Sequence, residues 1–172
     1  MSKLTKIGLL GMGLVMLLGS TAAAQRFAFI DSDKIQANYQ EWQKAQETFN
    51  TEYKAWEDQA AAMDEELQQM LADYDKQKLI LSADKKLERE AAINAKQEAL
   101  NSFTREISAP GGKAEQRMNE LVKPLYDKIT AAIEKVAIEE NYDFVFNSAG
   151  LAYAKKDLDI TDKVLEILES ED

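Results

Sequence analysis

Two interleaved series of side chains, each repeating every seven residues, dominate the first half of the sequence. The first series is Ile35, Trp42, Phe49, Trp56, Met63 and Met70, and the second is Tyr39, Gln46, Tyr53, Ala60, Leu67, Tyr74 and Leu81. Two series spaced three and four residues apart are the core positions of a coiled coil. The residues between them are mostly Glu, Asp, Lys, Gln and Ala, which favour helix and water. The pattern predicts one helix from residue 33 to about residue 78, about 70 Å long.

The periodicity fails at residues 79–82, where we expect the chain to turn back. Ser82 has the side chain of a helix N-cap, so a second helix would begin there and form an antiparallel hairpin with the first. Residues 108–112 interrupt this return helix, because Pro110 lacks a backbone N–H and the two glycines that follow it add flexibility. The sequence therefore predicts a mainly α fold with a helical-hairpin arm over residues 33–140, broken at a candidate hinge.

Short β segments are expected on both sides of the arm. Residues 26–31 are rich in aromatic and β-branched side chains and read as a strand. Residues 144–146 and 151–154 read as the two strands of a hairpin, and Thr161 is expected to cap a short terminal helix. The segments 25–32 and 141–172 would thus form a small β body.

This body is at the lower limit of independent stability, because three strands are about the minimum for an independent sheet. A two-helix arm has no room for a deep core either. Association of several chains would pool the strands and cover their edges, so we expect an obligate homo-oligomer. The side chains expected to hold the body together are Phe27, Phe29, Phe144, Phe146 and Tyr153.

The first 24 residues have the three parts of a secretory signal peptide. Lys3 and Lys6 precede an apolar run over residues 7–18, and small residues follow up to Ala24, where we place the cleavage. The apolar run is shorter than the roughly 20 residues that a membrane-spanning helix needs. An uncleaved membrane anchor is the alternative. The leader indicates an exported protein.

Composition excludes several classes of chemistry. The sequence has no Cys and no His, so it offers no thiol nucleophile, no imidazole base, no disulfide and no ordinary zinc or haem site. The acidic run at residues 157–162 loosely resembles a calcium loop but lacks the glycine and the distal Glu, and helix capping explains it better. We expect no enzyme activity, no cofactor and no metal. The net charge of −10 argues against nucleic acid as a partner.

Trp and Tyr are unusual in the core of a coiled coil, which is normally built from Leu, Ile and Val. These large amphipathic rings, together with adaptable Met side chains, suit a surface that accepts varied apolar partners. We predict that Trp42, Phe49, Trp56 and Met63 contact such partners. The alternative is that they only pack between the two helices of the arm.

Residues 27–35, Phe-Ala-Phe-Ile-Asp-Ser-Asp-Lys-Ile, followed by a long charged helical region, resemble the start of the Skp/OmpH-like periplasmic chaperones. Three later segments resemble the end of the same family, namely residues 124–129 (Pro-Leu-Tyr-Asp-Lys-Ile), 142–146 (Tyr-Asp-Phe-Val-Phe) and 159–165 (Asp-Ile-Thr-Asp-Lys-Val-Leu). The order and spacing of these motifs extend the resemblance over essentially the whole mature chain.

The resemblance implies a homotrimer shaped like a jellyfish, in which strands from three subunits form the body. Three helical arms would enclose a cavity for unfolded outer-membrane β-barrel proteins, and the protein would act without ATP as a holdase in the periplasm of Gram-negative bacteria. The best-known members are basic, with arms that attract clients and lipopolysaccharide, whereas this chain is acidic. Binding of lipopolysaccharide or membrane is therefore doubtful, and client capture would depend on apolar contact. A structural coiled-coil spacer or adaptor with one fixed cell-envelope partner is the alternative.

Overall fold

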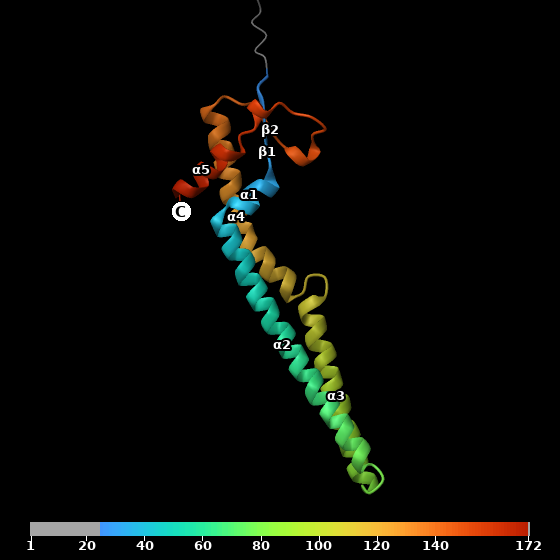
Figure 1. The fold of residues 1–172 in the computed structure, drawn as a ribbon. Coiled ribbons are helices and arrows are strands. Elements are labelled where there is room, and N and C mark those ends of the chain that lie inside the picture. Colours follow the sequence, from blue (N-terminus) through green and yellow to red (C-terminus); the bar gives the residue numbers. More distant parts are fainter. Residues whose placement is uncertain (1–24, 172) are drawn as a thin grey trace, which may run out of the picture.

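A computed structural model describes residues 25–171, and the predicted leader lies outside this range. A small body stands at one end, and a long two-column helical arm projects from it (Figure 1). The elements in chain order are β1 (Phe27–Ile30), α1 (Ser32–Asn38), α2 (Gln40–Gln77), α3 (Ala83–Ser108), α4 (Lys113–Glu139), β2 (Phe144–Asn147), the 3-10 turns η1 (Ser148–Gly150) and η2 (Lys156–Leu158), and α5 (Thr161–Glu171). The predicted mainly α fold with a helical hairpin and a small β part is confirmed.

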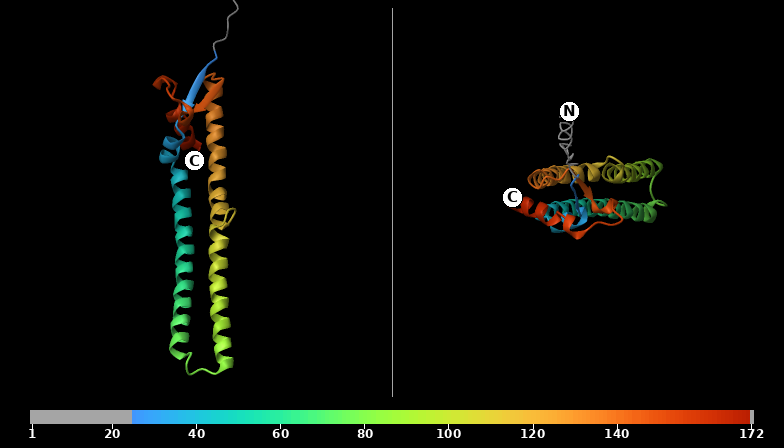
Figure 2. Two further views of the ribbon diagram at one scale, coloured as in Figure 1. Left: turned by 90° about the vertical axis from the view of Figure 1, so that its right-hand side faces the viewer. Right: turned by 90° about the horizontal axis from the view of Figure 1, so that it is seen from above.

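The arm consists of α2 in one column and α3 followed by α4 in the other (Figure 2). Ser82 accepts a hydrogen bond from the backbone N–H of Lys85 at 3.4 Å and so caps α3, as the sequence predicts. Leu67 is buried, and most other members of the two heptad series are half-buried, whereas the residues between them are largely exposed. The heptad pattern therefore identifies the side of α2 that meets the return helices.

The expected single helix from residue 33 is wrong at its beginning. Tyr39 adopts an extended backbone (φ −74°, ψ 114°) that separates α1 from α2. The heptad pattern does not reveal this break, because Ile35 and Tyr39 on its two sides are both buried in the body and so remain apolar. The N-cap of α1 is Asp31, whose side chain accepts a hydrogen bond from the backbone N–H of Lys34 at 3.0 Å.

The predicted interruption of the return helix is confirmed. It is a turn that side-chain hydrogen bonds and an ion pair hold together. The backbone N–H of Gly111 donates to the Glu115 carboxylate at 2.8 Å, and the Gln116 side chain donates to the Gly111 carbonyl at 2.7 Å. Lys113 and Glu106 form an ion pair at 2.9 Å across the turn. These contacts join the end of α3 to the start of α4.

The body sheet has two strands, and they pair in parallel. The register places Phe27 opposite Phe144 and Ile30 opposite Asn147. The predicted hairpin is wrong, because residues 151–154 form no strand. The side chain of Asn147 accepts a hydrogen bond from the backbone N–H of Ala149 at 3.0 Å, which turns the chain into η1 just where the hairpin would have continued.

The core lies where the body meets the base of the arm. It is built from the inner side of β1 and from α1, α4 and α5, with the start of α2 packed beside it. Its buried members are Ala28, Ile30, Ile35, Tyr39, Leu125, Ile129, Ala132, Val136, Ile160, Val164, Leu165 and Leu168. Asn141 follows α4 in the left-handed conformation (φ 56°) and directs the chain into β2. One compact core thus holds the two ends of the described chain together.

The buried polar side chain of Thr161 ties α5 to the end of β1. The Thr161 hydroxyl, which is fully buried, accepts a hydrogen bond from the backbone N–H of Asp31 at 2.9 Å. It also donates to the carboxylate of Asp159, which accepts a second bond from the Thr161 backbone N–H at 2.9 Å. The expectation that Thr161 caps the terminal helix is therefore wrong: Thr161 is the first residue of α5, and its hydroxyl instead satisfies a backbone group just after β1.

Candidate interaction surfaces

One face of the body sheet is aromatic and uncovered. Along β1, Ala28 and Ile30 point into the core, so Phe27 and Phe29 are on the opposite side. Phe27, Phe144 and Phe146 are 42%, 49% and 44% exposed, although they are large apolar side chains. We call these three rings the aromatic cluster.

The parallel register brings the aromatic cluster together from strands that are far apart in the sequence. The ring centroids of Phe27 and Phe144 are 5.7 Å apart, those of Phe27 and Phe146 are 6.0 Å apart, and those of Phe144 and Phe146 are 6.3 Å apart. Of the other side chains predicted to hold the body together, Phe29 is half-buried in β1, and Tyr153 is exposed on the loop after η1. Their role in assembly remains a prediction.

The predicted contact residues of α2 all lie along the seam with the return helices. The Trp42 ring meets Tyr126 of α4 edge-on, with centroids 5.2 Å apart, and Tyr53 lies between Phe49 (5.8 Å) and Trp56 (6.3 Å). Trp42, Phe49, Trp56 and Met63 are each half-buried. They therefore pack within the arm and keep part of their surface accessible, and binding of a partner by them stays a prediction.

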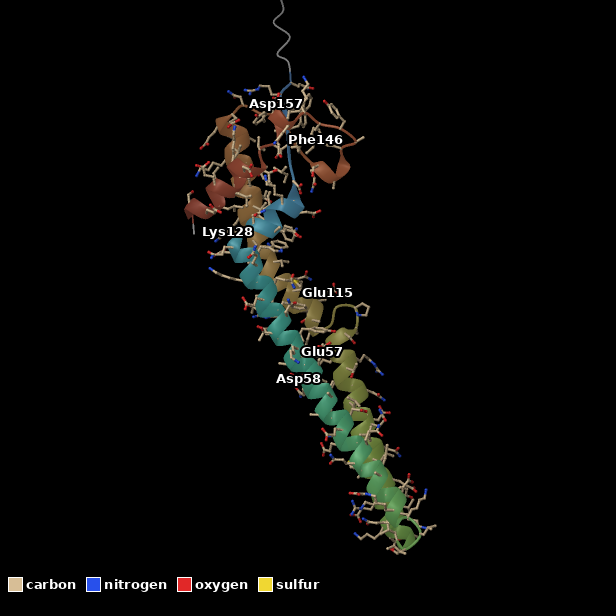
Figure 3. All side chains as sticks on the ribbon, in the orientation of Figure 1. Glu57, Asp58, Glu115, Lys128, Phe146 and Asp157 are labelled. Carbon is tan, nitrogen blue, oxygen red and sulfur yellow. The ribbon has the colours of Figure 1, made fainter. Side chains whose placement is uncertain are left out.

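Ion pairs fasten α2 to the return helices. Arg117 of α4 donates two hydrogen bonds to the Glu52 carboxylate, from Nε at 2.6 Å and from Nη2 at 2.8 Å. This hydrogen bonding lowers the pKa of the Glu52 carboxyl against an opposing effect of burial, and it raises the pKa of Arg117. Glu41 accepts from Lys128 at 2.7 Å near the base of the arm, and Glu66 pairs with Lys96 nearer the tip. Figure 3 shows Lys128 at the base of the arm.

The tip of the arm exposes apolar side chains that our sequence reasoning missed. Leu79 and Ile80 are 89% and 85% exposed at the turn between α2 and α3, and Leu87 is 66% exposed near the start of α3. The sequence analysis read residues 79–82 only as a turn. The available signal was the presence of large apolar residues in a segment that has no helix to pack against.

Within residues 25–171 the acidic side chains form no group that could hold a metal ion. None of the helices in this range combines the length and the apolar character that a membrane-crossing segment needs. The arrangement offers surfaces for macromolecular contact: an aromatic face on the body, a seam along the arm and an apolar tip.

A family model described as outer membrane protein (OmpH-like) matches residues 26–168, which is most of the chain. The chain belongs to this family. Among solved structures, the crystal structure of a protein described as an OmpH-like outer membrane chaperone from Caulobacter crescentus is similar to this OmpH-like chain, with a TM-score of 0.77 and 15% sequence identity. The match covers 87% of each chain, so the two proteins share most of this fold. No curated protein matches the sequence.

Proposed function

We propose that this OmpH-like chain is one subunit of a homotrimeric holdase, which binds unfolded outer-membrane β-barrel proteins in the periplasm without ATP and without catalysis. Family membership supports a role with outer membrane proteins, and the similar Caulobacter crescentus protein is described as a chaperone. The observation that carries the proposal is the uncovered aromatic cluster on the body from which the long arm projects.

The aromatic cluster favours assembly through the body. Three large rings contact one another and are still almost half exposed, so a single chain leaves apolar surface in water on a two-stranded sheet. Packing this face against copies of itself removes the apolar surface from water, and this burial favours association of the subunits. Assembly through the body leaves the arms free to project from it and to surround a client.

Client binding would then rest on many weak contacts. Each half-buried seam residue offers only part of its surface, and each square ångström of apolar area contributes about 25 cal/mol when it is removed from water. Several such contacts from several arms add up without demanding one client sequence. This mode shields the strand edges of an unfolded barrel, which otherwise aggregate.

The proposal is tested by light scattering on a sizing column with the chain from residue 25 onward. The chain is run alone and after dilution of a urea-unfolded outer-membrane barrel into it, with a folded soluble protein as the control client. We expect a particle of three chains that forms a soluble complex with the barrel and ignores the folded protein. A trimer that leaves the barrel to precipitate would contradict the holdase and favour a spacer or adaptor. A monomer would contradict the assembly.

A further inference from the structure

All methionines outside the predicted leader lie in the seam of the arm. The sequence has six Met and no Cys, and three of the six are in the first 24 residues. The other three are Met63 and Met70 of α2 and Met118 of α4, and each is half-buried. An oxidant that attacks protein sulfur would therefore act on the arm of the mature chain.

Two of these methionines flank the only deeply packed side chain of the lower arm. Leu67 is the one buried residue between positions 57 and 106, a stretch that the structure describes throughout. Met63 precedes Leu67 by four residues and Met70 follows it by three, so the three side chains form one continuous row on the side of α2 that meets α3. We call these three residues the lower row.

The lower row has a thin layer of partners on α3. The ion pair of Glu66 with Lys96 fixes the level at which the two helices meet, and Ile93 and Leu100 lie three residues before and four residues after Lys96. Both of these α3 side chains are half-buried. The ring contacts along α2 lie nearer the body, at residues 42–56. The lower arm thus depends on a few aliphatic and thioether side chains.

Half-burial makes a thioether both reachable and consequential. A methionine that keeps part of its surface in water is open to a small oxidant in the folded chain, whereas a fully buried one is protected. Oxidation to the sulfoxide places a polar S=O group where the side chain packs on apolar neighbours, and such a group is unfavourable there without a hydrogen-bond partner. A fully exposed methionine would be oxidised with little effect on packing.

We propose that Met63 and Met70 are a reversible oxidation site that loosens the lower half of the arm. Hydrogen peroxide is the oxidant: each thioether sulfur attacks one peroxide oxygen and loses two electrons, the O–O bond breaks, an S=O bond forms, and the second oxygen leaves as water. Sulfoxides on both sides of Leu67 then separate α2 from α3 below the Pro-Gly-Gly turn. A methionine sulfoxide reductase, supplied with a thiol reductant, regenerates the thioethers and closes the arm. This site does not depend on the proposed holdase function.

The inference is tested on the chain from residue 25 onward, treated with hydrogen peroxide under native conditions. Peptide mass spectrometry locates each added oxygen atom, and hydrogen exchange compares the arm before and after treatment. We expect oxygen at Met63 and Met70 and several-fold faster exchange in the lower parts of α2 and α3, while the body keeps its protection. Methionine sulfoxide reductase should restore the original exchange rates.

A matched pair of variants assigns the effect to the lower row. Met63→Leu with Met70→Leu nearly conserves side-chain volume and removes both sulfurs, so this double variant should keep its lower-arm protection in peroxide. Met118→Leu is the control, because Met118 lies in α4 on the other side of the turn, and it should loosen as the parent chain does. Circular dichroism before treatment checks that each variant keeps the parent's helical content.

Three outcomes would overturn the inference. The first is that peroxide leaves Met63 and Met70 unoxidised in the folded chain, and the second is that both are oxidised while exchange in the lower arm is unchanged. The third is that the peroxide-treated double variant loosens as much as the parent chain. If the double variant lacks the parent's helical content, recovery of the parent with the reductase decides instead, and no recovery overturns the inference. The holdase is tested separately, by particle size and barrel solubility.

Discussion

The Glu52–Arg117 pair is the most firmly built polar contact between the columns of the arm. Because hydrogen bonds from Arg117 lower the pKa of Glu52, the carboxylate stabilises the fold at neutral pH. A carboxyl with a lowered pKa contributes fully above its unfolded value, about 4.3, and loses its contribution as the pH falls through the lower folded value. The pair therefore stabilises the fold at neutral pH, and this contribution to stability is lost in acid.

We predict that Glu52→Gln lowers the midpoint of thermal unfolding at pH 7 by about 1–4 °C, since the pair is partly exposed to solvent. The difference from the parent chain should shrink as the pH falls from about 5 to about 3. Circular dichroism melts at fixed chain concentration measure it. Glu57→Gln is the control, because Glu57 is exposed and unpaired within residues 25–171, and it should shift the midpoint little at any pH. A difference in midpoint between Glu52→Gln and the parent chain that stays the same at acidic pH would contradict a stabilising role for the ion pair.

At the scale of elements, the turn between α3 and α4 depends on its two glycines for different reasons. Gly111 has a φ of +72°, which costs an L-residue about 1–2 kcal/mol, but a Cβ there would meet open space. A Cβ on Gly112 would come within 2.7–2.8 Å of the carbonyl oxygens of Ala109, Glu106 and Ile107. Those oxygens belong to backbone and cannot swing away.

We predict that Gly112→Ala destabilises the arm more than Gly111→Ala, because the first forces α3 and α4 apart and the second only strains one residue. Hydrogen exchange at α3 and α4 should show the larger loss of protection in Gly112→Ala. Gly150→Ala is a matched control, since its Cβ would also meet open space and its φ lies outside the left-handed range. If the two turn variants lose protection equally, the crowding around Gly112 is not decisive.

The elements show which patterns a sequence carries locally. Seven-residue repeats, the Ser82 cap, the Pro-Gly-Gly interruption and the left-handed Asn141 depend on near neighbours, and the structure has each of them. The helix break at Tyr39 could not be predicted from the sequence, because Tyr39 occupies a heptad position although its backbone is extended. The parallel pairing of β1 with β2 could not be predicted either. Strand propensity does not indicate which strands pair, and a hairpin needs a shorter connection than a parallel pair does.

At the scale of the whole molecule, the aromatic cluster predicts how assembly can be broken. Replacing Phe144 and Phe146 by Ser removes two of the three rings from a face that is already solvent-exposed in one chain, so the subunit should still fold. We expect the double variant to elute as a monomer with an unchanged helical content. The same pair of changes at Leu79 and Ile80, at the far end of the arm, is the control and should leave the assembly intact. A trimer that survives the loss of both rings would place the contacts elsewhere.

The interaction surfaces were only partly accessible from the sequence. Phe27, Phe144 and Phe146 stand out as aromatic residues in strands, and their common face follows from alternation once the strands pair. The sequence did not show which carboxylates of α2 are paired across the arm, because the pairing depends on how α3 and α4 are rotated about their axes. Only the three-dimensional positions of Lys96, Arg117 and Lys128 show which carboxylates are neutralised.

The parallel pairing of the two strands also bears on the order in which the chain can fold. The hydrogen bond from Arg26 to Asp143 spans 117 residues, and closing so long a loop from a random chain costs about 4 kcal/mol of entropy. The helical hairpin can instead close progressively from its tip, where the paired Glu66 and Lys96 are 30 residues apart, so we expect it to form before the strands pair. Once formed, it brings its two ends to the same place and replaces the long loop by a short one. The arm therefore acts as the template on which the body closes, and a chain cut short before β2 should keep a helical hairpin with β1 left unpaired.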